Sequence, residues 1–207
     1  MNCEALNSTK LNFEWAVKTH LPVQFQGQEV HFSAHAYQGS DAGDQAIALI
    51  HGEGADTPLV RVHSGCVTGD IFHSLRCDCY GQLQASLERI VASDHGIIIY
   101  LPYQEGRGIG LVNKIRSYAM QDQGLDTVDA NLALGEPIDA RNYDLAARIL
   151  ADLGHSKIRL LTNNPAKLTA LREMGINVIE QLPLIVSGNQ HNLNYLRVKK
   201  ERMSHLL

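Results

Sequence analysis

The sequence lacks any long apolar run, and no stretch approaches the roughly 18 residues that a helix needs to cross a bilayer. Its first ten residues also lack a basic start followed by an apolar segment, so we expect no signal peptide, no membrane partner and a cytoplasmic protein. Basic residues are not in excess, because 18 Lys and Arg stand against 22 Asp and Glu, for a formal charge of −4. This balance argues against a nucleic-acid partner, since such binding rests on excess positive charge.

Internal repeats and low-complexity segments are also absent. The 207 residues, 44% hydrophobic and 19% charged, suit one large domain or two small ones that share a core. Strand and helix patterns alternate from residue 80 onward, whereas the front is mostly strand. We therefore predict an α/β fold with a mixed sheet, flanking helices and a strand-rich N-terminal part. Residues 1–20 show no clear period and are predicted to form a peripheral arm before a domain at residues 21–207.

Hydrophobic periodicity predicts the individual elements. Strands are expected at residues 23–32, 47–51, 59–63, 96–101, 157–161 and 177–179. Helices are expected at residues 80–93, 111–123, 142–153, 165–174 and 194–207. The helix at 165–174 has Pro165 at its first position and Asn164 as its cap. Residues 126–138 carry mixed signals and are predicted to wind as loop and short turns.

Cysteines are few, but three of the four lie within fourteen positions, as Cys66, Cys77 and Cys79. In a reducing compartment this cluster indicates metal binding or catalysis rather than disulfides. Three thiolates suit Zn²⁺, and a structural site normally has four protein ligands. Three ligands leave a position for a water, whose pKa the metal lowers toward about 7. Alternatively, His63 or Cys3 completes the shell and zinc only staples loops, or the thiols are free and no metal binds.

Two strand-to-helix junctions are candidate phosphate sites. The first, QEGRGIG at residues 104–110, has glycines that let backbone N–H groups approach an anion, and Arg107 to grip phosphate. A tight structural turn explains it equally well. Lys114 and Arg116 follow, as phosphate contacts or as solvated residues. In the second junction, Thr162 and Lys167 are placed to reach a phosphate, unless the segment is an ordinary capped helix.

Asp139 and Arg141 form a third candidate, just before a predicted helix. The carboxylate is suited to accept a proton or to fix the arginine. The alternative is an exposed capping carboxylate beside a surface arginine.

Together these segments resemble GTP cyclohydrolase II, a zinc-enzyme family that opens the guanine ring of GTP at the start of riboflavin synthesis. The resemblance covers about residues 58–207. It rests on RVHSGCVTGD at 61–70, SLRCDC at 74–79, QEGRGIGL at 104–111, NKIRSY at 113–118, DT at 126–127, LTNNP at 161–165 and PL at 183–184. Several motifs in one order are far more specific than any single motif.

The resemblance implies one Zn²⁺ held by Cys66, Cys77 and Cys79 with its fourth position open. It implies GTP contacts from Arg61, Val62, His63, Ser64, Gly65, Gln82, Glu105, Gly106, Arg107, Thr127, Thr162 and Lys167. It further implies Asp139 as proton acceptor, Arg141 as nucleophile toward the α-phosphate, and Tyr118 near the ring chemistry. Because the pKa of arginine stays above about 12 in proteins, we expect Arg141 to contact phosphate first.

The family's products are formate, pyrophosphate and a diamino-ribosylamino-pyrimidinone phosphate, and the resemblance also implies a homodimer and Mg²⁺ with the triphosphate. The sequence departs from the family pattern at three places. Gly65 stands where glutamate is usual, Tyr103 where arginine is usual, and Tyr80-Gly81 inverts the usual order. A paralogue that opens or binds another purine nucleotide is therefore the main alternative, and a non-catalytic nucleotide-binding zinc protein is the third.

Overall fold

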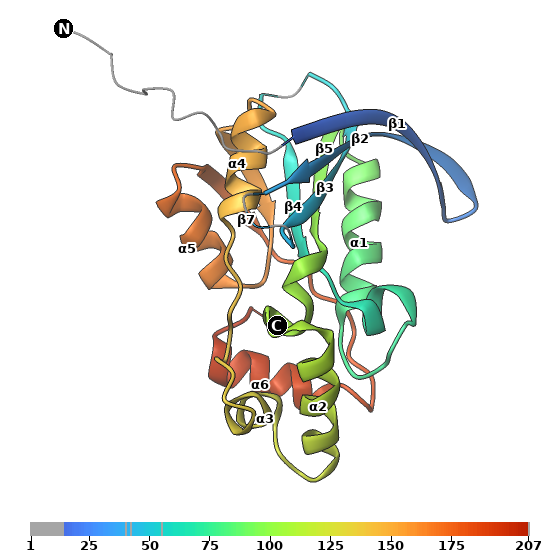
Figure 1. Ribbon diagram of the computed structural model, residues 1–207. Helices are drawn as coiled ribbons and strands as arrows, with labels where there is room; N and C mark the ends of the chain where they lie inside the picture. The colour runs from blue at the N-terminus through green and yellow to red at the C-terminus, as the bar shows by residue number, and fades with distance from the viewer. Residues whose placement is uncertain (1–14, 40, 42, 55, 207) are drawn as a thin grey trace, which may run out of the picture.

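The computed structural model describes residues 15–39, 41, 43–54 and 56–206, and its centre is one seven-stranded sheet in the order β1-β2-β3-β5-β4-β6-β7 (Figure 1). The strands are β1 Trp15–Phe25, β2 Gln28–Gln38, β3 Gln45–Gly52, β4 Leu59–Ser64, β5 His95–Leu101, β6 Lys157–Leu161 and β7 Asn177–Leu182. The pairs β1–β2, β2–β3 and β3–β5 are antiparallel. The pairs β5–β4, β4–β6 and β6–β7 are parallel. The predicted mixed sheet is confirmed.

The N-terminal hairpin corrects two predictions. We predicted one strand over residues 23–32, but Gln26 and Gly27 adopt φ of 47° and 80° and turn the chain between β1 and β2. We also assigned residues 15–20 to a peripheral arm, whereas β1 begins at Trp15. This edge strand is held by backbone pairing with β2, and because its residues 17–20 are exposed, that half of the strand shows no apolar period. Residues 1–14 lie outside the described residues.

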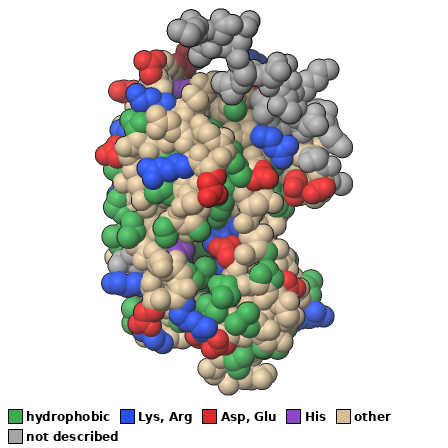
Figure 2. All heavy atoms as spheres, turned by 90° about the vertical axis from the view of Figure 1, so that its left-hand side faces the viewer, with side chains coloured by type: hydrophobic (Ala, Val, Ile, Leu, Met, Phe, Trp, Pro, Cys, Tyr) green, Lys and Arg blue, Asp and Glu red, His purple; other side chains and the backbone are tan. Residues whose placement is uncertain are grey.

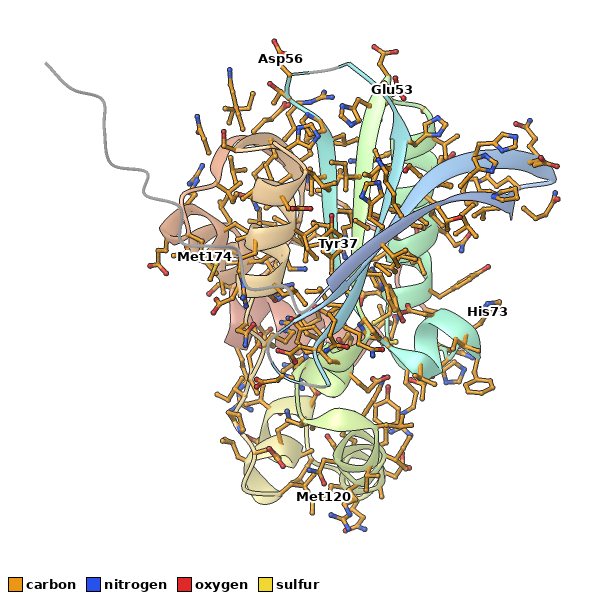
Figure 3. All side chains as sticks on the ribbon, turned by 45° about the horizontal axis from the view of Figure 1, so that its top comes forward. Tyr37, Glu53, Asp56, His73, Met120 and Met174 are labelled. Atoms are coloured by element: carbon orange, nitrogen blue, oxygen red, sulfur yellow. The ribbon has the colours of Figure 1, made fainter. Side chains whose placement is uncertain are left out.

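Helices cover both faces of the sheet. Their bounds are α1 Cys79–Val91, α2 Gly110–Asp122, α3 Thr127–Ala133, α4 Asp144–Asp152, α5 Pro165–Glu173 and α6 Leu193–Met203. In β5, Ile97 and Ile99 pack with α4 and α5, whereas Ile98 packs with α1 on the other face. This strand is apolar throughout because both of its faces are buried. Tyr37 of β2 lies beneath α4 and donates a 3.0 Å hydrogen bond to Asp152 (Figure 3).

Helices α2, α3 and α6 form a separate layer below the sheet, near the ends of β4 and β5 (Figure 1). Helix α3 corrects the loop predicted at 126–138, and Asp126 caps it by accepting from the N–H groups of Val128 and Asp129. Two short segments follow the central strands: a π-helical turn at Val67–Ile71 leads from β4 toward α1, and a 3₁₀ turn at Pro102–Arg107 leads from β5 to α2 in this layer. Among the described residues, none of the helices has the length and apolar character that a bilayer crossing requires.

The last helix ends earlier than predicted. Helix α6 stops at Met203, and Ser204 takes a left-handed φ of 55°. The chain then folds back, because the N–H of His205 donates to the Lys199 carbonyl at 3.1 Å and the N–H of Leu206 to the Asn163 carbonyl at 2.9 Å. On the face that Figure 2 shows, acidic and basic side chains are interspersed, as the near-balanced composition predicts.

Candidate active site

Three cysteines meet where β4 runs into α1. Cys66 follows β4, Cys77 lies in the loop, and Cys79 is the first residue of α1. Their sulfurs all lie within 4.8 Å of one another, and those of Cys66 and Cys77 are 3.8 Å apart. Tetrahedral zinc with Zn–S bonds of about 2.3 Å needs sulfurs about 3.8 Å apart, so the trio fits this ion. The predicted ligand trio is thus brought together, as free thiols.

A tight turn holds the trio. In the π-helical turn after Cys66, the N–H of Gly69 donates to the Cys66 sulfur at 3.3 Å. A β carbon on Gly69 would lie 3.0 and 3.1 Å from the sulfurs of Cys66 and Cys77, and 2.9 Å from Cβ of Cys79. The space beside the sulfurs therefore exists only because residue 69 has no side chain. This glycine belongs to the VTGD stretch, whose spacing gave no sign of its role.

We expect Gly69→Ala to weaken zinc binding by about tenfold or more, since displaced ligand supports typically cost 10–100-fold in metal affinity. Competition with a chromophoric chelator measures this. Gly81→Ala is the matched control, because its added methyl group would meet Val186 at an ordinary 3.5 Å. Equal zinc affinity in the two variants would show that the space at Gly69 does not matter for holding the three sulfurs.

Lys114 lies buried against the trio rather than in solvent. Its Nζ is 2.9 Å from the Cys66 sulfur and 2.5 Å from Oε1 of Glu105. Hydrogen bonds with Cys77 and Cys79 hold the pKa of Cys66 well below its usual range, and the Lys114 charge adds to this. The site thus favours the thiolate form of Cys66, the form that binds metal, whereas hydrogen bonding with Cys66, together with burial, raises the pKa of Cys77 and of Cys79. Of the two basic residues considered on this helix, only Arg116 is exposed.

Glu105 fixes the loops rather than facing the substrate space. It accepts hydrogen bonds from the backbone of Val67 at 2.6 Å and of Gly106 at 2.9 Å, besides the contact with Lys114. The N–H groups of Gly106 and Gly108 bond within the turn, as a tight structural turn requires. The side chain of Arg107, not a ring of backbone N–H groups, is what this junction offers to an anion.

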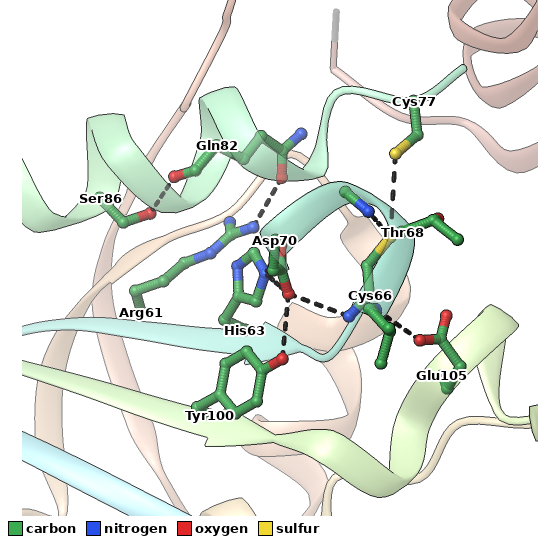
Figure 4. Close-up of polar contacts among 12 residues, drawn as sticks. Arg61, His63, Cys66, Thr68, Asp70, Cys77, Gln82, Ser86, Tyr100 and Glu105 are labelled. Carbon is green, nitrogen blue, oxygen red and sulfur yellow. Dashed lines mark hydrogen bonds and ion pairs between the residues drawn. The ribbon is translucent and has the colours of Figure 1, made fainter. Parts of the chain in front are cut away.

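Behind the first ligand lies a buried carboxylate, Asp70 (Figure 4). It accepts from the Cys66 N–H at 2.9 Å and from the Tyr100 hydroxyl at 3.1 Å. His63 contacts both Asp70 oxygens at 3.2 Å and stacks on Tyr100. The imidazole is therefore committed to Asp70 and does not join the cysteine cluster. Cys3, the other candidate fourth ligand, lies outside the described residues.

Next to the trio is a pocket rich in positive charge. Its basic residues are Arg61, Arg107, Arg141, Lys167 and Lys199, and its acidic residue is Asp78. Neutral and imidazole side chains complete the lining, including His63, Ser64, Gln82, Thr162, Asn163, Asn164, Tyr195, Met203 and His205. A second pocket contains the trio with Gly65, Gly106, Tyr118 and Thr127. The two pockets adjoin, since Ser64, Cys79, Arg107, Arg141 and Tyr195 line both.

Three cations of the first pocket, Arg61, Arg107 and Lys167, form no ion pair with a described residue, whereas Arg141 and Lys199 are paired with Asp139 and Asp78. Burial, and the charges of Arg61 and Arg141, hold the pKa of Lys167 well below its usual value. Its Nζ donates to the Val62 carbonyl at 2.6 Å, so Val62 contributes its backbone while its side chain stays in the core. Burial likewise lowers the pKa of Arg61 to about 10. Buried charge without a partner is unfavourable, and an anion would relieve it.

Unpaired polar atoms point to the same pocket. Seven buried side-chain polar atoms of the described residues have no hydrogen-bond partner, and five of them belong to Arg61, His63, Asn164 and His205, all in the pocket lining. Most buried polar atoms in proteins are hydrogen-bonded. The concentration of exceptions here indicates a binding site for a polar ligand.

Arg141 and Asp139 form an ion pair at the pocket wall. Nε of Arg141 donates to Oδ1 of Asp139 at 2.8 Å, and Nη2 contacts Oδ2. Burial opposes ionisation of both groups, but their mutual hydrogen bonds outweigh it, lowering the pKa of Asp139 and raising that of Arg141. The guanidinium stays charged, and the carboxylate is a weak base in this arrangement.

The remaining candidates line one or both of the two pockets. Arg107 donates to the carbonyl of Thr127 at 2.8 Å and contacts its hydroxyl. Tyr118 lies 4.5 Å from the guanidinium of Arg76, and burial raises its pKa to about 12, so the phenol stays protonated. Thr162 accepts from the N–H of Asn164 at 3.1 Å, and Asn164 caps α5 as predicted.

Sequence reasoning missed the contribution of α6. Tyr195, Lys199, Met203 and His205 all line the cation-rich pocket. Lys199 pairs with both oxygens of Asp78 at 3.1 Å, and Asn192 donates to the Cys77 carbonyl at 3.2 Å. No local spacing links these residues to the earlier motifs, so no sequence signal identifies them.

Two positions that depart from the family pattern adjoin each other. A β carbon on Gly65 would lie 2.8 Å from Cα of Pro102, so this position has no room for a side chain. Tyr103 packs against the core instead of lining either pocket. Gly65 thus lines the pocket around the cysteines, whereas Tyr103 lines neither pocket.

Comparison with known proteins agrees with these features. The sequence profile described as GTP cyclohydrolase II matches residues 14–183. The chain is 50% identical over 177 residues to a GTP cyclohydrolase-2 of Streptomyces coelicolor, covering 85% of this chain and 80% of that protein. It is 50% identical over 196 residues to a GTP cyclohydrolase-2 of Acinetobacter baylyi (93% and 96%). A riboflavin biosynthesis protein RibBA of Aquifex aeolicus is 45% identical over 195 residues, which is 93% of this chain and 47% of that protein.

Proposed function

Because the chain belongs to the GTP cyclohydrolase II family of enzymes, we propose that it hydrolyses the guanine imidazole ring of GTP with the help of Zn²⁺. The products are formate, pyrophosphate and a diamino-ribosylamino-pyrimidinone phosphate, which serves riboflavin biosynthesis. The observation that carries the proposal is the junction of two pockets, one around three thiols and one lined by five cations.

The cation-rich pocket suits a triphosphate. Arg61, Lys167 and Arg107 are buried or nearly so, and the arginines offer planar forks that match phosphate oxygens. A bound triphosphate supplies the missing counter-charge and places the attached base toward the adjoining pocket. We propose that Mg²⁺ accompanies the triphosphate, as in other phosphate-binding enzymes.

Cys66, Cys77 and Cys79 would hold the zinc, which supplies Lewis acidity beside C8 of the guanine when bound. Around it, Lys114 keeps the first ligand ionised, and Asp70 fixes the ligand's backbone. The protonated Tyr118 phenol lines the same pocket and is suited to donate a hydrogen bond to the opening ring. Lys114 and Asp70 thus support the zinc ligand Cys66, and Tyr118 orients the base for hydrolysis.

Arg141 is best suited to bind phosphate. Its charged form is stabilised by Asp139, which disfavours the nucleophilic role that requires a neutral guanidine. A charged fork at this wall stabilises the negative charge that develops when pyrophosphate leaves. Asp139 then holds the arginine in place and does not accept a proton while the ion pair persists.

The proposal predicts that zinc-loaded protein with GTP and Mg²⁺ releases formate and pyrophosphate in equal amounts. Enzyme-coupled assays quantify both products. Release of formate without pyrophosphate would indicate a different phosphate chemistry. If neither product is released, the assignment is refuted. Parallel reactions with ATP and XTP address the alternative of a paralogue, because Gly65, one of the departures, lines the pocket around the cysteines. Homodimerisation and a cytoplasmic location also remain proposals.

A further inference from the structure

His205 occupies an unusual position at the end of the chain. The left-handed Ser204 turns the backbone after α6, and hydrogen bonds from His205 and Leu206 to the carbonyls of Lys199 and Asn163 fix the turn at 3.1 and 2.9 Å. The His205 residue is only 9% exposed and lines the cation-rich pocket. The backbone that carries the imidazole is thus fixed by two hydrogen bonds.

Neither ring nitrogen of His205 has a hydrogen-bond partner among the described residues. An imidazole always carries a donor, an acceptor, or two donors, so a buried ring without partners calls for an explanation. The nearby carboxylate, Asp78, is already occupied by Lys199 and Gln82. No group of the described chain is therefore placed to satisfy this ring.

The charges around His205 define what can satisfy it. Lys199 of α6, Arg141 before α4, Lys167 of α5 and Asp78 before α1 act on the ring. Burial, followed by the charges of Lys199 and Arg141, lowers its pKa to about 3, so the ring is neutral at pH 7 with one N–H to donate. A further cation is excluded by repulsion, whereas an anionic oxygen both accepts this N–H and neutralises the surrounding cations.

We propose that His205 is a phosphate-binding residue, whose ring N–H donates to an oxygen of the nucleotide's triphosphate. This inference rests on the proposed function and extends it to a residue beyond the stretch 14–183 that the family profile matches. Helix α6, which ends just before His205, contacts the cysteine loop through its cap Asn192 and through Lys199. His205 is therefore held at a fixed place relative to the thiols. The end of the chain is thereby a wall of the active site.

The test is direct binding of inorganic tripolyphosphate to the zinc-loaded full-length protein by isothermal titration calorimetry. We expect His205→Ala to raise Kd by about tenfold or more, since a hydrogen bond to a charged group is typically worth that much. His205→Asn places an N–H near the Nδ1 position and His205→Gln near Nε2. One of the two is expected to recover most of the affinity, which also identifies the donating nitrogen.

His191→Ala is the matched control, because His191 lies exposed just before the same helix. Melting temperature and zinc content establish that each variant is folded. Two results would overturn this inference while leaving the proposed function intact. The first is a His205→Ala variant whose Kd equals that of the wild type. The second is a loss of affinity that neither His205→Asn nor His205→Gln recovers in folded protein. Wild-type protein that neither binds tripolyphosphate nor converts GTP would instead refute the proposed function.

Discussion

Cys77→Ser is expected to lose zinc and GTP ring opening together. The Cys77 sulfur lies 3.8 Å from that of Cys66, in a buried trio that suits a soft divalent metal. A serine hydroxyl ionises far less readily than a thiol and is a poorer ligand for zinc. Because even the outer partners of metal ligands change affinity by 10–100-fold, we expect kcat/KM to fall by more than about a hundredfold. Elemental analysis and the formate assay measure the two losses.

Cys3→Ser is the matched comparison, since Cys3 is the remaining cysteine of the chain. If it retains full zinc and activity, three thiolates suffice to hold the metal. Loss of zinc in Cys3→Ser would show a closed, four-cysteine shell. Retention of zinc with full activity in Cys77→Ser would remove the ligand assignment altogether.

Arg141→Ala is expected to reduce kcat/KM for GTP by about a hundredfold or more, the usual loss when a preorganised donor to developing negative charge is removed. Zinc content should stay unchanged, because Arg141 forms its side-chain hydrogen bonds with Asp139 and not, among the described residues, with the cysteines. Arg141→Lys keeps the charge but cannot form the two-pronged contact with Asp139, so its activity should lie between wild type and Arg141→Ala.

Arg197→Ala serves as the control for lost positive charge, since Arg197 is exposed on α6 and pairs with Glu201. Initial rates of formate and pyrophosphate release separate the effects on ring opening and on phosphate cleavage. Wild-type rates for both products in Arg141→Ala would show that the ion pair with Asp139 is structural.

Sequence patterns predicted the parts of the site that rest on local chemistry. The spacing of Cys66, Cys77 and Cys79 predicted a trio whose sulfurs the fold brings together, and Asn164 with Pro165 predicted the start of α5. These signals are local because ligand type and capping depend on neighbouring residues. The fully buried β5 was predicted for the same reason, since its apolar run and flanking glycine lie together in the sequence.

The predictions failed where distant packing decides the outcome. The surroundings of Lys114 depend on a cysteine 48 positions earlier, and nothing in the helix pattern marks it as buried. The turn at Gln26-Gly27 interrupts a plausible alternating run, and the first half of β1 is exposed at residues 17–20 and has no buried face to reveal it. Helix α6 contacts Asp78 across 121 positions, a relation that only the folded chain establishes.

One side chain joins the two halves of the site. Asp78 stands between two of the cysteines, accepts from Gln82 at 2.6 Å and pairs with Lys199, while Gln82 in turn accepts from Arg61 at 2.6 Å. A displacement of Arg61 is therefore expected to shift Cys77 and Cys79 through Gln82 and Asp78. Substitutions in the two halves of the site are therefore expected to be non-additive in their effects, and so epistatic in evolution.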